Sequence, residues 1–112
     1  MLRNAMRRLL GSRRLEGADP SQAAFCSSLV VEGRRPRLLY RDVAVGPMDS
    51  GWQLIEGSES EEWLQVDGHC VVLHLDHLLR EWPELAAPIA DEREQSAWSW
   101  DDVARRYVDM SG

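Results

Sequence analysis

The sequence predicts an α+β fold: a single domain with a mostly antiparallel sheet of about four or five strands and helices packed against it. The length of 112 residues is typical of one domain. A hydrophobic fraction of 44%, which includes five tryptophans, is enough for one core. Strand-like segments also follow one another without the long crossovers that parallel strands require. We therefore assign residues 23–112 to one compact domain and residues 1–22 to an N-terminal helix and linker.

Residues 2–10 are predicted to form an amphipathic helix, because apolar residues recur at helical spacing with arginines on the opposite side. The apolar positions are Leu2, Ala5, Met6 and Leu9. Gly11 ends the helix, and the polar residues 12–22 form a linker. We expect the helix to dock on the domain; the alternatives are a frayed extension and attachment to a membrane surface.

Strands are predicted in four segments, which are 25–31, 37–45, 52–55 and 70–75. In the second segment, side chains alternate between two faces, one of which carries Leu38 and Tyr40. The fourth segment is almost entirely apolar and is predicted to be a central strand covered on both faces. Trp98 and Trp100 alternate in the same way and predict a fifth, short strand.

Two helices are predicted between these strands. A capping box formed by Ser58 and Glu61 opens the first. This helix is expected to bury Trp63 and Leu64. Apolar residues at helical spacing predict the second helix, which Pro83 ends. They are Leu75, Leu78, Leu79 and Trp82.

A third helix is predicted after the last strand. Ser99 and Asp102 have the spacing of a helix cap. The apolar residues that follow keep a helical spacing; they are Val103, Ala104, Tyr107 and Val108. We therefore expect residues 103–108 to be helical.

The net charge of −6 is unevenly distributed along the chain. Residues 1–41 contain nine arginines and three acidic residues, a net charge of +6, whereas residues 42–112 contain four arginines and sixteen acidic residues, a net charge of −12. The acidic part does not neutralise phosphates, so nucleic acid is not an expected partner. It suits a basic protein partner, because opposite fields accelerate encounter and orient the two surfaces.

The sequence favours a cytoplasmic protein that does not enter a membrane. Arginines interrupt the apolar residues of the first ten positions, so the unbroken apolar run of a secretory signal is missing. No stretch approaches the roughly eighteen apolar residues of a membrane span. Cys26 and Cys70 lie far apart in apolar surroundings, which favours two buried thiols over a disulfide.

The residues that could carry chemistry do not match a catalytic or metal-binding pattern. Cys70, His74 and His77 have a spacing similar to zinc ligation, but a closed zinc site needs four ligands with a matching second pair. The segment Asp49-Ser50-Gly51-Trp52 lacks the spacing of a nucleophile elbow and is predicted to form a tight turn.

The acidic residues Glu59, Glu61 and Glu62 are predicted to form the solvated face of a capped helix. Use of these carboxylates in glycoside hydrolysis is disfavoured, because so small a domain would not frame a substrate cleft. We therefore expect no catalytic residue, no metal and no cofactor. A binding role is the remaining expectation.

One set of motifs resembles a bacterial immunity-protein family, family thirty-three of the immunity proteins of polymorphic toxin systems. The motifs are Tyr40-Arg41, Asp49-Ser50-Gly51-Trp52, Gly57-x-Glu59, Glu62-Trp63-Leu64 and Asp67. The resemblance extends from about Phe25 to Trp98. The family's more acidic Gly-Asp-Glu-Asp is here Gly57-Ser58-Glu59-Ser60, and its late glycine-serine-alanine-phenylalanine element survives only as Ser96-Ala97-Trp98.

The resemblance implies a cytoplasmic protein that binds a cognate toxin and blocks it by stoichiometric occlusion. The expected toxin acts on a cytosolic target such as nucleic acid or a nucleotide. Candidate toxin-binding residues are Glu59, Glu61, Glu62, Asp67 and Asp49. The residues expected to form the scaffold of the motif are Tyr40, Arg41, Ser50, Gly51, Trp52, Gly57 and Trp63, with Trp52 in the core. The alternative functions are a regulatory or scaffold module that binds an endogenous protein or small ligand and, less favoured, a metal-dependent enzyme.

Overall fold

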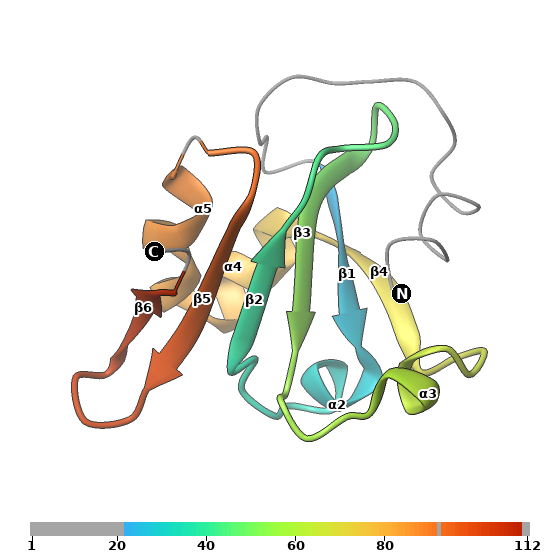
Figure 1. Ribbon diagram of the computed structural model, residues 1–112, viewed down its shortest axis with the longest axis horizontal. Helices are drawn as coiled ribbons and strands as arrows, with labels where there is room; N and C mark the ends of the chain where they lie inside the picture. The colour runs from blue at the N-terminus through green and yellow to red at the C-terminus, as the bar shows by residue number, and fades with distance from the viewer. Residues whose placement is uncertain (1–21, 92, 111–112) are drawn as a thin grey trace.

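The computed structural model describes residues 22–91 and 93–110, which form a six-stranded sheet with short helices packed against it (Figure 1). The strands lie in the order β4-β1-β3-β2-β5-β6. Their bounds are β1 Ala23–Ser27, β2 Leu38–Arg41, β3 Asp49–Ile55, β4 Cys70–His74, β5 Ser96–Asp101 and β6 Arg106–Asp109. The predicted N-terminal helix at 2–10 lies outside the described residues.

The α+β class and the mostly antiparallel sheet are confirmed, with one strand more than the largest number expected. β1 pairs in parallel with β3, and every other neighbouring pair in the sheet is antiparallel. The described helices are α2 Ser28–Val31, α3 Glu61–Leu64, α4 Leu75–Glu81, the 3-10 helix η1 Pro83–Leu85 and α5 Ala86–Ala90. None of them has the length and apolarity needed to cross a membrane.

The core lies between the sheet and the segment that contains α4, η1 and α5. Trp52 and Leu54 of β3 point into it and are buried, as is Leu39 of β2. Leu75 and Leu78 of α4 meet them from the helical side. The burial of Trp52 confirms its expected place in the core. These helices cover one face of the sheet. Of the described helices, α3 packs on the other face, which lies toward the viewer in Figure 1 and which we call the open face.

The helix predicted to end at Pro83 is confirmed as α4, whose apolar residues at helical spacing face the core. The chain continues into η1 with Pro83 at its first turn, where the missing N–H of proline costs no hydrogen bond. Cys26 is a buried free thiol, and Cys70 is a half-buried one.

Residues 28–31 form α2, so the strand predicted over 25–31 is wrong in its second half. Ser27 ends β1 and caps the helix, because its hydroxyl accepts a hydrogen bond from the backbone N–H of Leu29 at 3.1 Å. The strand predicted over 37–45 is also shorter, since β2 contains only Leu38–Arg41.

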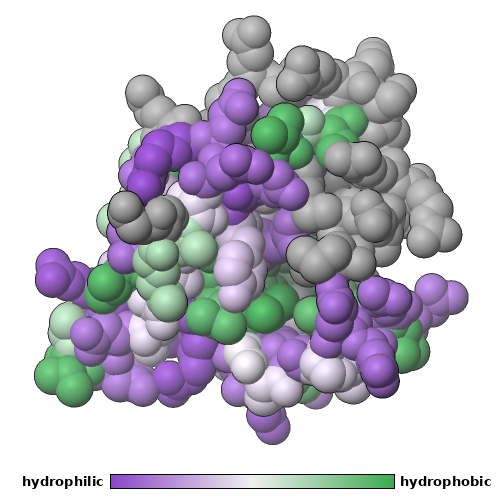
Figure 2. Space-filling view, in the orientation of Figure 1, coloured by the Kyte–Doolittle hydropathy of each residue, from purple (hydrophilic) through white to green (hydrophobic). Residues whose placement is uncertain are grey.

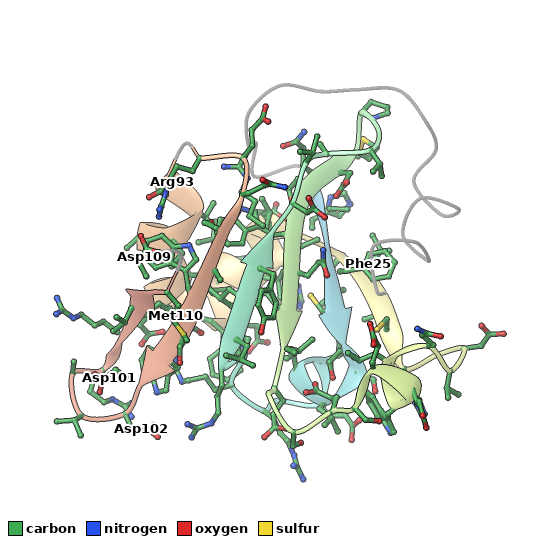
Figure 3. All side chains as sticks on the ribbon, in the orientation of Figure 1. Phe25, Arg93, Asp101, Asp102, Asp109 and Met110 are labelled. Carbon is green, nitrogen blue, oxygen red and sulfur yellow. The ribbon has the colours of Figure 1, made fainter. Side chains whose placement is uncertain are left out.

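The helix predicted at 103–108 is wrong, because β5 and β6 form an antiparallel hairpin there. The carboxylate of Asp101, which Figure 3 labels beside the hairpin, accepts hydrogen bonds from the backbone N–H groups of Val103 and Ala104. Arg105 then adopts a φ of 57°, a left-handed conformation that reverses the chain. Tyr107 of β6 is buried and donates its hydroxyl hydrogen to the carbonyl oxygen of Pro36 at 2.7 Å.

Two further expectations are corrected. β4 lies at one edge of the described sheet and its residues are half-buried or exposed, so 70–75 is not a central strand covered on both faces. β1 and β3 occupy the interior of the sheet and are almost entirely buried. Asp49-Ser50-Gly51-Trp52 begins β3, so this segment is part of a strand instead of a tight turn.

Candidate binding groove on the open face of the sheet

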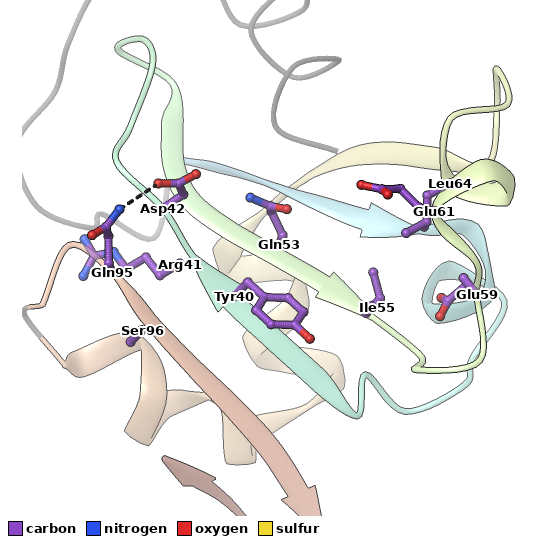
Figure 4. A pocket seen from close by; sticks show the side chains of 10 residues that line it. All are labelled: Tyr40, Arg41, Asp42, Gln53, Ile55, Glu59, Glu61, Leu64, Gln95 and Ser96. Atoms are coloured by element: carbon purple, nitrogen blue, oxygen red, sulfur yellow. Dashed lines mark hydrogen bonds between the residues drawn. The ribbon is translucent and has the colours of Figure 1, made fainter. Parts of the chain in front are cut away.

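A groove of about 510 Å³ lies on the open face, above β2 and β3 (Figure 4). Its lining comes from three separate parts of the chain: the strand β2 with the residue after it, the segment from β3 to α3, and the start of β5. The lining residues are Tyr40, Arg41, Asp42, Gln53, Ile55, Glu59, Glu61, Leu64, Gln95 and Ser96. Figure 2 shows apolar surface in the middle of this face and hydrophilic surface around it.

The floor of the groove is largely apolar. Tyr40 of β2 has 41% of its surface exposed and lies opposite Gln53 of β3 in the antiparallel register. Ile55 of β3 and Leu64 of α3 pack against the buried ring of Phe25. Figure 4 shows Tyr40, Gln53 and Ile55 between two polar ends of the groove. The tyrosine therefore offers a large apolar ring with a polar tip to whatever enters.

One end of the groove is formed by α3 and the loop before it. Ser60 caps this helix, because its hydroxyl accepts a hydrogen bond from the backbone N–H of Trp63 at 3.1 Å. The predicted cap at Ser58 is wrong: its hydroxyl donates to the Glu56 carboxylate. The helix is only four residues long, and Trp63 and Leu64 are half-buried instead of fully buried as expected.

Glu59 is built into the loop between β3 and α3. Its carboxylate accepts hydrogen bonds from the backbone N–H groups of Glu56, at 2.8 Å, and Gly57, at 2.7 Å. Burial raises the pKa of this carboxyl, but the hydrogen bonds that it accepts from Ser27 and from the backbone outweigh the effect of burial, so the pKa lies below its ordinary value. Glu59 is therefore charged at neutral pH and holds the loop at the end of the groove.

The other acidic residues near α3 face solvent. Glu61, Glu62 and Asp67 are exposed, and Glu61 lines the groove. Trp63 stacks on His69, with 3.9 Å between the ring centroids. The ring nitrogen Nδ1 of His69 lies 2.7 Å from the carbonyl oxygen of Trp63. This pair links the short helix to the residue before β4.

The opposite end of the groove contains Arg41, Asp42, Gln95 and Ser96. The guanidinium of Arg41 is buried and donates hydrogen bonds to the carbonyl oxygens of Asp91, at 2.9 Å, and Arg93, at 3.0 Å. It also lies 5.7 Å from the centroid of the Trp52 ring. Arg41 thus ties the segment before β5 to β2. Asp42 accepts a hydrogen bond from Gln95 Nε2 at 3.5 Å (dashed in Figure 4).

Asp49 is completely buried, in contrast to the exposure that a toxin-binding residue requires. Its two carboxylate oxygens accept hydrogen bonds from the backbone N–H groups of Val45 and Gly51, each at 2.8 Å. The adjacent Ser50 hydroxyl donates to the carbonyl oxygen of Ala23 at 2.7 Å. Asp49 and Ser50 therefore organise the loop before β3 and its contact with β1.

Glycine is required in this motif by both conformation and space. Gly51 has a φ of 87°, and a β carbon at this position would lie 2.1 Å from the carbonyl oxygen of Asp42. The backbone N–H of Asp42 in turn donates to the Gly51 carbonyl oxygen at 2.9 Å. Gly57 has a φ of 113°, in the loop that Glu59 caps. The two glycines allow the backbone to form the two ends of the groove.

The described residues near the groove offer binding groups and no activated nucleophile. The groove lining contains three carboxylates and one arginine. Burial and the nearby Glu59 carboxylate raise the pKa of the Cys70 thiol to about 11, and burial raises that of Cys26 further, so both thiols stay protonated at neutral pH. The described residues contain no group of three or more histidine, cysteine or acidic side chains arranged to hold a metal ion.

Sequence reasoning found part of this lining. Tyr40, Arg41, Glu59, Glu61 and Leu64 were singled out by motif or charge, and the structure brings all five to one groove. Sequence reasoning missed Gln53 and Ile55. The alternation of side chains along β3 could have found them, because Leu54, which lies between them, is buried on the core side and its two neighbours therefore face the opposite side. Ser96 was named only as part of the family's late element, and Gln95 carries no local signal, because this segment reaches the groove through the pairing of β5 with β2.

Comparison with known families supplies the identity of the domain. The model of the immunity protein Imm33 domain matches residues 24–107. This chain belongs to the Imm33 family. The match contains β2 to β5 and all of β1 except Ala23, and it confirms the resemblance found in the sequence motifs. No curated protein and no solved structure matches the chain.

Proposed function

We propose that this Imm33 domain is a cytoplasmic immunity protein that binds a cognate bacterial toxin and neutralises it by stoichiometric occlusion, without catalysis of its own. The observation that carries the proposal is the open face, where a groove with an apolar floor ends in carboxylates. Family membership adds the expectation of a toxin as the partner. The fold thus provides a surface for recognition, and its thiols are held in the unreactive protonated form.

The acidic surface suits a toxin whose active site is basic. Glu61, Glu62 and Asp67 are exposed around α3, next to the groove. A toxin that cleaves nucleic acid or a nucleotide needs cations to hold phosphates, and carboxylates of an inhibitor compete for the same cations. We therefore propose a nuclease or nucleotide-targeting toxin as the partner class, with Glu61 and its neighbours facing the toxin's cleft.

A second candidate function is a regulatory module that binds a small endogenous ligand or protein. The observation that favours it is the size of the groove, because about 510 Å³ falls within the range of small-molecule sites. The carboxylates at both ends would then select a cationic ligand. This candidate predicts binding in the absence of any toxin.

Co-expression with the toxin encoded beside the gene tests the proposal. We expect the full chain to protect cells from that toxin and to co-purify with it in a one-to-one complex. A matched control replaces the toxin with an unrelated toxin of similar charge, against which the chain should give no protection. Unprotected cells, together with no complex by size-exclusion chromatography, would reject the immunity function and favour the regulatory module.

A further inference from the structure

We infer that the cognate toxin adds an extended segment of its own chain to the sheet at the edge formed by β4; this inference rests on the function proposed above. Backbone hydrogen bonds to Cys70 and Val72 hold the segment, and a basic residue of the segment lies near Asp67. Strand addition of this kind takes its affinity from main-chain hydrogen bonds and its specificity from the side chains beside them. The inference therefore gives one part of the toxin a defined position on this domain.

The hydrogen bonds between β1 and β4 determine which backbone groups of β4 face outward. The backbone N–H of Leu75 donates to the Gln22 carbonyl oxygen at 2.9 Å, and that of Ser28 donates to the His69 carbonyl oxygen at 2.7 Å. Both pairs continue the antiparallel register of the two strands, in which hydrogen-bonded pairs alternate with pairs that are not hydrogen-bonded. The odd-numbered residues of β4 thus bond to β1. The N–H and C=O groups of its even-numbered residues point away from β1.

Two of these outward-facing residues, Cys70 and Val72, are available to a further strand. β4 lies at the edge of the described sheet, and the outward backbone groups of these two residues have no hydrogen-bond partner within residues 22–91 and 93–110. Alternate residues of an extended chain lie roughly 6.6 Å apart, so a strand placed beside β4 has the spacing to bond to both residues at once.

β4 also lacks the features that protect most sheet edges. Its residues, Cys70–His74, include no lysine, arginine, acidic residue or proline, and its pairing with β1 has a regular register. β6, at the opposite edge of the described sheet, carries Arg106 and Asp109 and contacts α5 and η1. Charged side chains, bulges and covering helices are the usual means by which proteins prevent pairing at an edge. β4 is therefore the edge that suits strand addition.

The edge is continuous with the open face. Val72 lies opposite Phe25 in the register, so the two side chains are on the same face of the sheet. Phe25, which Figure 3 labels, packs against Ile55 and Leu64 of the groove lining. Val72 has 37% of its surface exposed and extends this apolar surface to the edge. A toxin that covers the groove can therefore reach β4 and place an apolar side chain on Val72.

The charge near the start of β4 favours a basic segment. Glu62 of α3 and Asp67, which lies three residues before β4, are both exposed. Neither carboxylate forms an ion pair with another residue in the described part of the chain. An arginine or lysine at this end of the added segment would balance their charge and fix the direction in which the toxin approaches.

A second copy of this chain is disfavoured as the occupant of the edge. Antiparallel pairing of Cys70 in one copy with Val72 in the other would bring Asp67 of each copy towards Asp76 of the other. Each copy also carries a net charge of −6. Like charges at both ends of the paired strands oppose that contact. A basic segment of a different protein avoids this repulsion.

The test measures amide hydrogen exchange and toxin binding in the full chain. NMR spectroscopy follows exchange at individual amides of the chain alone and in complex with the toxin recovered by co-expression. Val72→Pro removes the outward N–H of Val72, and proline is tolerated at edge positions whose N–H faces away from the sheet. Val72→Thr is the matched control, because it keeps the backbone N–H and the β-branched shape. Circular dichroism and thermal unfolding establish that each variant is folded before its binding is measured.

We expect the amides of Cys70 and Val72 to exchange at least about tenfold more slowly in the complex than in the chain alone, because hydrogen bonds to the toxin protect them. Val72→Pro should raise Kd about tenfold or more, since an acceptor of the toxin loses its partner, whereas Val72→Thr should stay within about threefold of the wild type. If Val72→Pro does not fold, the exchange measured on the wild type decides the question.

Three outcomes would overturn the inference and leave the immunity function standing. The first is tight toxin binding with unchanged exchange at Cys70 and Val72. The second is a folded Val72→Pro variant that binds the toxin as tightly as Val72→Thr does. The third is slow exchange at both amides before the toxin is added, in which case sedimentation would show whether a second copy covers the edge. Failure of the wild type to bind or protect at all would instead reject the proposed function itself.

Discussion

The α carbon of Gly51 faces the carbonyl oxygen of Asp42 so closely that a β carbon on Gly51 would lie 2.1 Å from that oxygen. The contact joins β3 to the residue that follows β2, at one end of the groove. Gly51 also has a φ of 87°, a backbone conformation that residues with a side chain rarely adopt. Gly51 of the family motif thus fixes the position of a groove residue, Asp42.

Replacing this glycine should therefore destabilise the domain. We expect Gly51→Ala to lower the free energy of unfolding by at least about 1–3 kcal/mol, the cost of a strained backbone, with the clash against Asp42 in addition. Chemical denaturation measures the loss. Gly33→Ala is the matched control, because Gly33 has a φ of 108° but open space around its α carbon. Equal losses in the two variants would show that the close approach to Asp42 is unimportant.

Glu59 should make stability depend on pH in a way that its amide variant lacks. Burial raises the pKa of Glu59, but the hydrogen bonds that its carboxylate accepts lower the pKa by more. The pKa therefore lies below the ordinary value of 4.5. A carboxyl with a lowered pKa stabilises the fold above its ordinary pKa, and the contribution is lost as pH falls through the folded-state pKa. We expect the stability difference between wild type and Glu59→Gln to be constant near pH 7 and to shrink below pH 4.5.

Thermal unfolding at a series of pH values measures this difference. Glu62→Gln serves as the comparison, since its side chain is exposed on the neighbouring helix α3. If the difference in stability between wild type and Glu59→Gln stays the same from pH 7 to pH 3, the role assigned to the Glu59 carboxylate is contradicted. In that case, the hydrogen bonds to Glu56 and Gly57 would not depend on its charge.

Arg35 should be a main support of the helical side of the domain. Its guanidinium carbon lies 3.8 Å from the ring centroid of Trp100 and 4.8 Å from that of Trp82, and it donates a hydrogen bond to Glu84 at 3.2 Å. We expect Arg35→Ala to cost about 2 kcal/mol of stability, because a partly buried cation loses two aromatic faces and a carboxylate at once. Arg34→Ala, at an exposed position, should cost much less.

Denaturation followed by tryptophan fluorescence checks this prediction, since Trp82 and Trp100 both contact the arginine. Arg35→Lys should recover only part of the loss, because a lysine keeps the charge but lacks the planar group that stacks on the rings. Full stability in Arg35→Lys would indicate that charge alone matters at this position.

Charge reversal around α3 should change the rate at which the domain associates with the toxin. We expect a double variant, Glu62→Arg with Asp67→Arg, to slow association several-fold at low salt and to leave dissociation almost unchanged, because exposed charges at the rim act on encounter. The matched control is Asp76→Arg with Glu81→Arg on α4, which changes net charge by the same amount at exposed positions of another helix. Stopped-flow or biosensor kinetics measure the association and dissociation rates separately for both variants. Equal slowing in both variants would mean that only net charge matters.

The sequence predicted the class of fold well, because class depends on patterns that the chain carries locally. The alternation around Leu39 and Tyr40 and the helical spacing of Leu75 and Leu78 are reproduced in β2 and α4. Two local patterns were misleading. Residues 28–31 contain two valines but follow Ser27, whose hydroxyl caps a helix. The cap was the stronger signal there.

The helix predicted at 103–108 failed because a local turn and a tertiary contact together decided the structure. The spacing of Val103, Tyr107 and their neighbours fits a helix, but the Asp101 carboxylate holds a turn and the Tyr107 hydroxyl bonds the distant Pro36 carbonyl oxygen. The bond from Tyr107 to Pro36 joins residues far apart in the chain and has no signature in a local window of sequence, whereas the turn at Asp101 is local. The same limit applies to β6, which exists only through its pairing with β5.

The candidate site was predicted in its residue types and only partly in its arrangement. The acidic residues near α3 were evident from the sequence, as was the family motif, but exposure separates them: Glu61 lines the groove, whereas Asp49 is buried under backbone hydrogen bonds. The groove itself arises where β2, β3 and the start of β5 meet. Strand order in the sheet creates that meeting, and the sequence does not display strand order.

The most direct test of the central claim, that the open face is the surface that binds the toxin, is hydrogen–deuterium exchange of the chain alone and in the complex. Binding at the groove predicts slower exchange in residues 56–64 and 42–46, the loops that border it, and no change in residues 75–90, which contain α4, η1 and α5. Slower exchange confined to 75–90 would contradict the claim and place the toxin on the helical side of the domain.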